Sequence, residues 1–275
     1  MVIFLLAVGL VPAIGRGANF VERSRYGSID WTNRIIEAVG QSTFPKYEGT
    51  KPRARSLAKK LAIQKARKNL LSIIMAITMD SGRSVSDFIK GDKERLIKLT
   101  SLVKSAELAN LSFVGKDTVR VTLSLRFNGP VADLILPDYI KRIRPIIKMG
   151  SCTTNPKSSY TGILIDCSEI SFKPCLVPRI INEKEEEIFG PAYVSRDCVT
   201  REGMVRYVKG PDKRINTLWL GKKILKLKAL RVLRGNPNIV VLTNSDAESI
   251  RANPVNLLLF HDCKVVFVLG KRPSK

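Results

Sequence analysis

The sequence has a single histidine, His261, and only five cysteines in 275 residues, none of them in a C-x-x-C pair. Zinc sites and thioredoxin-type redox chemistry need clustered ligands of these types, so their scarcity argues against both. Phosphate-cradling G-x-x-x-x-G-K and nucleophile-bearing G-x-S-x-G motifs do not occur either. The sequence therefore predicts a protein without catalytic residues, cofactors or metals.

The lone histidine stands two residues before Cys263 in FHDC. On a strand both side chains would face the same way, as a thiol nucleophile and its base must. No further residue is placed to orient the histidine. A histidine at the end of a strand is therefore the simpler interpretation.

An odd cysteine count leaves at least one thiol unpaired if the others form disulfides. Cys152 could pair with Cys167, Cys175 or Cys198, and the sequence does not choose among them. Cys167 lies within GILIDC, which is typical of a small apolar residue inside a core.

Long apolar runs are also scarce, and the one that stands out is at the N-terminus, from Val2 to Ile14. It is too short to span a bilayer and has the length of a secretory signal, although no positive charge precedes it. We predict a signal peptide over residues 1–18, cleaved after Gly15, Gly17 or Ala18; a late start codon or a buried element are the alternatives. No later run approaches 18 apolar residues, so no transmembrane span is expected after cleavage.

Acidic residues are few. Lys and Arg number 47 against 24 Asp and Glu, a net charge of +23. This imbalance favours anionic partners such as nucleic acid, anionic lipid or cell-wall polymers. The alternative is that proteins of the source organism are generally rich in lysine, in which case the charge implies no anionic partner.

The first basic concentration is KPRARSLAKKLAIQKARKNLL, residues 51–71, with eight Lys or Arg and no acid. Its apolar residues recur at steps of three and four, which predicts a helix with one buried face that ends near Asp80–Gly82. The predicted face consists of Leu57, Ala58, Leu61, Ala62, Ala66, Leu70, Ile73, Ile74 and Ile77.

Burying that face contributes about 10–20 kcal/mol gross, at roughly 1.5–3 kcal/mol per large apolar side chain, whereas each exposed charge adds little. The basic residues are therefore expected to form a solvated face, and contact with an anionic polymer is the alternative. The stretch has no aromatic side chain on which a base could stack. The candidate contacts here are Lys59, Lys60, Arg67 and Lys68.

The second basic concentration, residues 209–234, holds nine Lys or Arg against one acid. Within it, KKILKLK predicts a strand that places alternate lysines on one side. Such lysines either protect a sheet edge from aberrant pairing or contact a polyanion. The candidate contacts are Lys222, Lys223, Lys226 and Lys228.

The apolar pattern divides the chain into two predicted domains. In residues 19–135, two short strands precede the long helix, a weaker helix runs from Val85 to about Ser105, and a hairpin ends with the alternating strand 118–127. This order predicts an α+β domain with a long helix packed on an antiparallel sheet. The Pro-bounded segment 136–159 is the predicted linker.

Residues 160–275 form the second predicted domain, which is mixed α/β. A helix is predicted over 194–208 in spite of Gly203, and another over 245–253 with Ser245 as its cap. Apolar runs predict strands at 160–168, 177–182, 186–191, 223–233, 239–243 and 264–270.

Several of these segments together resemble a known family. IDWTNRIIEAVG, LAKKLAIQKARKNLL and VRVTLSLRFNGPVADLI are similar to the exported α+β domain shared by lipoprotein-20-like proteins and the N-terminal part of flagellar assembly protein T. YTGILIDCSEISFKPCLVPRIINEKEEEIFG and NSDAESIRAN resemble the C-terminal half often joined to that domain in periplasmic proteins. The resemblance spans residues 28–270 and contains no chemical signature.

The resemblance implies export, residence in the periplasm or at the outer membrane, and a non-catalytic role as a scaffold or assembly component, in some members around the flagellar basal body. The implied partners are other envelope or flagellar proteins, further copies of the chain, and anionic lipid or cell-wall polymer. No cysteine precedes Cys152, so a lipid anchor directly after the signal is not expected. The long helix is also more basic, at Lys65, Arg67 and Lys68, than in relatives.

The rival hypothesis is a cytoplasmic nucleic-acid-binding protein that uses the two basic concentrations. Its affinity for a duplex would fall steeply with salt, with a logarithmic slope of about 0.9 per phosphate neutralised.

Overall fold

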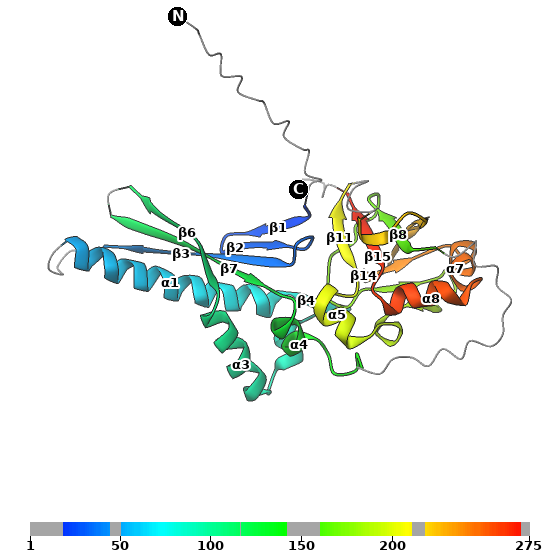
Figure 1. The fold of residues 1–275 in the computed structure, drawn as a ribbon, viewed down its shortest axis with the longest axis horizontal. Helices are drawn as coiled ribbons and strands as arrows, with labels where there is room; N and C mark the ends of the chain where they lie inside the picture. Colours follow the sequence, from blue (N-terminus) through cyan, green and yellow to red (C-terminus); the bar gives the residue numbers. More distant parts are fainter. Residues whose placement is uncertain (1–18, 45–50, 116, 142–159, 211–217, 271–275) are drawn as a thin grey trace, which may run out of the picture.

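The computed structural model describes residues 19–44, 51–115, 117–141, 160–210 and 218–270 (Figure 1). The predicted signal peptide, Cys152 and most of the predicted linker lie outside these residues. At the start of that linker, Leu136 and Ile140 are buried in the apolar core.

An antiparallel sheet of five strands forms the N-terminal half, in the order β1-β2-β3-β7-β6. β2 pairs with β3 and β6 pairs with β7, so both predicted strand pairs are hairpins. β1 escaped prediction because its four residues show no alternation of apolar and polar side chains. The strands are β1 (Val21–Ser24), β2 (Gly27–Asp30), β3 (Ile35–Thr43), β6 (Glu107–Val114) and β7 (Thr118–Arg126).

Helix α1 (Lys51–Ala76) packs along β3 and β7 on one face of this sheet (Figure 1). Alanines spaced four apart are buried along α1 and are here called the alanine seam: Ala54, Ala58, Ala62 and Ala66. Gly40 of β3 lies directly against the seam, where a Cβ atom would overlap the carbonyl oxygen of Ala62 and the amide nitrogen of Ala66. Small residues on both sides therefore bring the helix unusually close to the sheet.

The predicted buried face of α1 is wrong at Leu61, which is 38% exposed. Successive residues of a helix point about 100° apart. Because Ala62 makes the contact with the sheet, the side chain of Leu61 is turned aside. The apolar period correctly predicts the helix, but small residues rather than large ones set its line of contact with the sheet.

The segment after α1 also differs from the prediction. α1 ends at Ala76, and the predicted helix from Val85 to Ser105 is broken in two. Gly91 has φ +86°, and Asp92 then caps the second helix by accepting a hydrogen bond from the amide of Arg95. The elements are β4 (Thr78–Asp80), β5 (Arg83–Ser84), α2 (Val85–Ile89), α3 (Lys93–Lys104) and α4 (Pro130–Ile135).

The C-terminal half contains two four-stranded sheets. One is entirely parallel, in the order β11-β15-β8-β12, and the other is mixed, in the order β10-β9-β14-β13. β15, inside the parallel sheet, is buried at every residue, which explains its uninterrupted apolar sequence. The strands are β8 (Gly162–Cys167), β9 (Arg179–Ile181), β10 (Glu187–Phe189), β11 (Arg206–Lys209), β12 (Ile224–Lys228), β13 (Arg231–Leu233), β14 (Asn236–Val241) and β15 (Val265–Leu269).

The helices of this half correct two predictions. Gly203, with φ +74°, ends α5, and the chain continues as strand β11 where a helix to 208 was predicted. Thr243 rather than Ser245 caps α7, since its hydroxyl accepts from the amide of Asp246. The elements are η2 (Pro191–Tyr193), α5 (Arg196–Glu202), α7 (Asn244–Arg251) and α8 (Pro254–His261).

The two halves share one apolar core. The Trp31 ring meets the edge of Tyr207 at 5.6 Å and that of Phe127 at 5.8 Å between centroids. Beside it, the Thr32 hydroxyl donates to the carbonyl of Tyr207 at 2.7 Å. The predicted fold class is confirmed: a long helix on an antiparallel sheet, followed by a mixed α/β part.

Arg34 extends this junction. Its Nη2 donates to the carbonyl of Val205 at 3.1 Å, while its Nε is buried without a hydrogen-bond partner. Burial lowers the pKa of Arg34 to about 10, helped by the nearby charge of Arg206. The guanidinium passes directly over Gly203, where a Cβ would overlap it.

The alanine seam gives the first prediction. Gly40→Ala adds a methyl group that the backbone of α1 already excludes, so the helix must move away from the sheet. We expect the free energy of unfolding to fall by about 3 kcal/mol, measured by urea denaturation.

Gly91→Ala is the control. Gly91 has positive φ but nothing within 4 Å of an added Cβ, so only the backbone conformation opposes the change, at about 1–2 kcal/mol. An equal loss of unfolding free energy in the two variants would contradict the close approach of α1 to Gly40.

Candidate interaction surface

The first group of predicted contact residues lies on α1. Lys59, Lys60 and Lys68 are exposed, as a solvated helix face requires. Arg67 is only partly exposed, and its Nη2 donates to the carbonyl of Lys104 at the end of α3, at 2.8 Å. Arg67 therefore supports packing between α1 and α3, and the other three have charges directed to solvent.

The second group lies on and before β12, at the edge of the parallel sheet in the other half. Lys222, Lys223, Lys226 and Lys228 are exposed. Lys228 pairs with Glu169 at 2.8 Å, which raises the pKa of its amine. The structure does not bring the two basic groups onto one element, so they do not form a single binding strip.

A further candidate interaction surface, which the sequence analysis did not identify, lies on strand β6. β6 is an edge strand that pairs with β7 alone among the strands of the described residues. It exposes apolar side chains along its length. Leu108, Leu111 and Phe113 stand opposite Leu123, Val121 and Val119 of β7. The three β7 residues are buried beneath α1, whereas the three on β6 are 47%, 37% and 57% exposed.

The position of α1 explains this exposure. The helix packs mainly on β3 and β7 and covers β6 much less (Figure 1). The apolar side chains of β6 therefore continue the core-facing side of the sheet past the edge of the core. We call Leu108, Leu111, Phe113 and the free edge of β6 the β6 surface.

A basic border runs beside the β6 surface. Arg55 of α1 lies over the Phe113 ring, with its Cζ 5.5 Å from the centroid. At the other end of the strand, Arg67 reaches Lys104, three residues before β6. Lys59 follows Arg55 by four residues, so it lies on the same side of the helix. Apolar side chains, a free strand edge and positive charge thus meet in one place.

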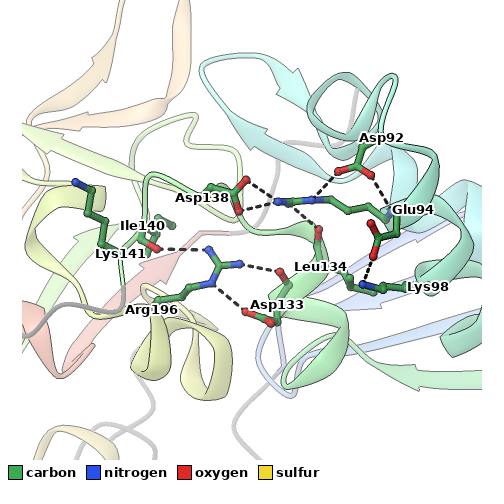
Figure 2. A pocket seen from close by; sticks show the side chains of 10 residues that line it. Asp92, Glu94, Lys98, Asp133, Leu134, Asp138, Ile140, Lys141 and Arg196 are labelled. Atoms are coloured by element: carbon green, nitrogen blue, oxygen red, sulfur yellow. Dashed lines mark hydrogen bonds and ion pairs between the residues drawn. The ribbon is translucent and has the colours of Figure 1, made fainter.

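A hollow of about 640 Å³ lies between α3, α4 and α5 (Figure 2). Its side chains are mostly charged, yet all four of its acids are already paired. Arg95 pairs with both Asp92 and Asp138, and Glu94 pairs with Lys98. Figure 2 shows Arg196 beside Asp133, with which it also forms an ion pair. The hydrogen bonds from Arg95 hold the pKa of Asp138 below its usual range. All four acids of the hollow are therefore engaged in ion pairs.

Arg196 is the centre of this cluster. It is 8% exposed and donates to the Asp133 carboxylate at 2.9 Å, to the Asp133 carbonyl at 2.7 Å and to the Pro137 carbonyl at 2.8 Å. It thus joins α5 of the C-terminal half to α4 of the N-terminal half. The geometry is that of a clamp between elements rather than of a reactive site.

The predicted geometry of His261 and Cys263 is wrong. His261 ends α8 and Cys263 follows in a turn, so the strand that would align them does not exist there. His261 Nδ1 contacts Asp262 at 2.9 Å and its Nε2 is buried without a partner. Among the described residues, no group of three or more His, Cys, Asp or Glu is placed to hold a metal ion.

One comparison with known proteins bears on the C-terminal half. Residues 162–271 match the family model of the second domain of Treponema pallidum Tp0624. The match runs from the start of β8 to just beyond β15 and takes in both sheets of that half. It does not reach the N-terminal half, for which the resemblance to lipoprotein-20-like proteins and flagellar assembly protein T stays a prediction. No curated protein matches the chain.

The helices bear on membrane association. Within the described ranges, no helix combines the length and apolar character needed to cross a bilayer.

The Arg196 clamp gives the second prediction. Arg196→Met keeps the length of the side chain but leaves the carbonyls of Asp133 and Pro137 without their donor. We expect the free energy of unfolding to fall by about 2–4 kcal/mol, measured by urea denaturation at neutral pH.

Arg201→Met is the matched control on the same helix. The Arg201 side chain is 70% exposed and its nearest acid, Glu202, is 3.8 Å away, so the change should stay within about 0.5 kcal/mol. A similar loss of unfolding free energy in both variants would contradict the role of Arg196 in joining α5 to α4.

Proposed function

We propose that the protein is a non-catalytic component of the cell envelope that holds other proteins, exported to the periplasm or the outer membrane. The observation that carries the proposal is the β6 surface, where apolar side chains and a free strand edge lie beside a basic helix. The charged hollow at α3, α4 and α5 supports it indirectly, because its acids are committed to ion pairs.

The energetics favour a partner that adds a strand. Burying a large apolar side chain completely contributes roughly 1.5–3 kcal/mol. Leu108, Leu111 and Phe113 are about half buried already, so covering them adds roughly 3 kcal/mol in total. Association costs about 4–15 kcal/mol in lost freedom, so the apolar contact alone is insufficient. Main-chain hydrogen bonds to the β6 edge would supply further affinity, as in other strand-addition complexes.

The charge of the border selects the kind of partner. Arg55 and Lys59 stand beside the apolar side chains, so an extended segment with carboxylates next to apolar residues complements the surface. A second copy of this chain is less suitable, because the same basic border would face itself. Flagellar or other envelope proteins with such segments are the partners we propose.

Nucleic acid, anionic lipid and cell-wall polymer remain rival ligands for the basic side of α1. The structure adds two aromatic rings to that side, Phe113 beneath Arg55 and Phe44 in edge contact with Phe113. The two rings lie at 69° to one another, so they offer no pair of parallel faces on which successive bases could stack. We therefore place nucleic acid among the outcomes of the test rather than in the proposal.

The third prediction concerns the partner. A photo-cross-linking amino acid at position 113 should form a protein adduct in cells, and the same group at position 226 on β12 should not. The captured partner, produced separately, should bind the purified chain with affinity that falls as salt rises. Lys59→Glu should weaken this binding roughly tenfold at low salt.

Lys226→Glu is the control, since it makes the same charge change on the other basic element. Adducts at position 113 that disappear on nuclease treatment would favour the nucleic-acid alternative and contradict the proposal. Equal weakening by the two substitutions would show that net charge, and not the β6 surface, drives binding.

The fourth prediction concerns export. The mature chain recovered from cells should begin after Gly15, Gly17 or Ala18 and should fractionate with the envelope. Mass spectrometry of the N-terminal peptide, together with fractionation, measures both. A chain that retains Met1 in the cytoplasmic fraction would refute export without deciding whether the β6 surface binds a partner.

A further inference from the structure

Two cysteines from distant parts of the sequence meet in the core of the C-terminal half. Cys198 belongs to α5, and Cys263 lies in the turn between α8 and β15. They are 7% and 1% exposed. Both are free thiols in the structure, and they are close enough for each to shift the pKa of the other. Figure 1 shows α5 and α8 as neighbours.

The backbone holds this meeting point on both sides. The amide of Ser195 donates to the carbonyl of His261 at 3.5 Å, so the start of α5 contacts the end of α8. The Ser195 hydroxyl accepts from the amide of Cys198. Cys263 has φ +52°, a conformation uncommon for residues other than glycine, and its amide donates to the carbonyl of Phe260. The position of each thiol is therefore fixed by its own element.

The electrostatic environment distinguishes this pair from the other described cysteines. The Cys263 thiol donates to Cys198 and lowers the pKa of Cys198, with help from the charge of Arg201. The same contact and burial raise the pKa of Cys263. Cys167 and Cys175 have pKa values raised mainly by burial. Cys198 is thus the thiol most readily ionised, with a second thiol beside it.

We propose that Cys198 and Cys263 form a disulfide bond in the mature protein. The oxidant is another disulfide, either a small molecule or an oxidising thiol catalyst. The Cys198 thiolate attacks one sulfur of that disulfide and releases one thiol. Cys263 then loses its proton, attacks the sulfur of Cys198 in the mixed disulfide and releases the second thiol. Because both residues are buried, the exchange needs a local opening of α5 that admits the oxidant while the two thiols stay beside each other.

The bond would tie α5, which carries Arg196, to the end of the parallel sheet. This inference goes beyond the proposed function, since it concerns covalent maturation and does not depend on the β6 surface. It also differs from the pairings expected from the sequence, all of which involved Cys152. Spacing along the chain gives no sign that residues 198 and 263 meet.

The test uses the full-length protein. The reduced chain is refolded with oxidised and reduced glutathione, blocked with N-ethylmaleimide in denaturant, and digested with trypsin. We expect one linked product that joins residues 197–201 to residues 252–264, two hydrogens lighter than the separate peptides. Residues 158–179, which hold Cys167 and Cys175, should carry two maleimide groups. Cys152→Ser should leave the linked product unchanged.

A second measurement avoids reliance on buried substitutions. The disulfide closes a loop of about 65 residues, so reduction should lower the melting temperature of the wild-type protein by about 5–15 °C. Full maleimide labelling of Cys198 and Cys263, or a disulfide from either one to Cys152, would overturn the proposal. An unchanged melting temperature after reduction would do so as well.

Discussion

The close approach of α1 to β3 at Gly40 is the contact on which the architecture of the N-terminal half depends. Alanines at four-residue steps allow the helix backbone to reach the sheet where β3 has no side chain. In this position α1 covers β3 and β7 and leaves most of β6 uncovered. The same placement turns Lys59 and Lys60 outward. The basic helix face and the apolar β6 surface thus both result from the packing of α1 on β3. Neither of them contributes to the core.

The rest of the structure holds that surface in position. The Trp31 ring packs on Tyr207 from the other half, and Arg196 joins α5 to α4 with several hydrogen bonds. Such satisfied, partly buried contacts favour a fixed arrangement of the two halves over free movement. The free end of the β6–β7 hairpin and the start of α1 point away from the C-terminal half (Figure 1). The β6 surface is therefore accessible at one end of a rigid frame.

Much of the fold could be predicted because its signals are local. β7 alternates strictly, β15 is a continuous apolar run, and α1 has the helical period. The predictions from the sequence were wrong where a single residue changes the direction of the chain or where elements distant in sequence meet. Gly203 turns a predicted helix into a strand, and the exposure of Phe113 depends on how far α1 extends across the sheet. The sequence pattern of β6 is the same whether a helix covers it or not, so the candidate surface could not be found from sequence alone. The candidate contact lysines are exposed, and their contact with an anionic partner stays a prediction; Arg67 is instead hydrogen-bonded to the end of α3.

The central claim is that the β6 surface is open in the isolated protein and covered in the cell. Hydroxyl-radical footprinting of Phe113 tests it most directly, with the buried Phe267 as an internal reference. The account predicts strong oxidation of Phe113 in the purified chain and marked protection in freshly isolated envelopes, with Phe267 protected in both. Equal oxidation of Phe113 in the two preparations would contradict it.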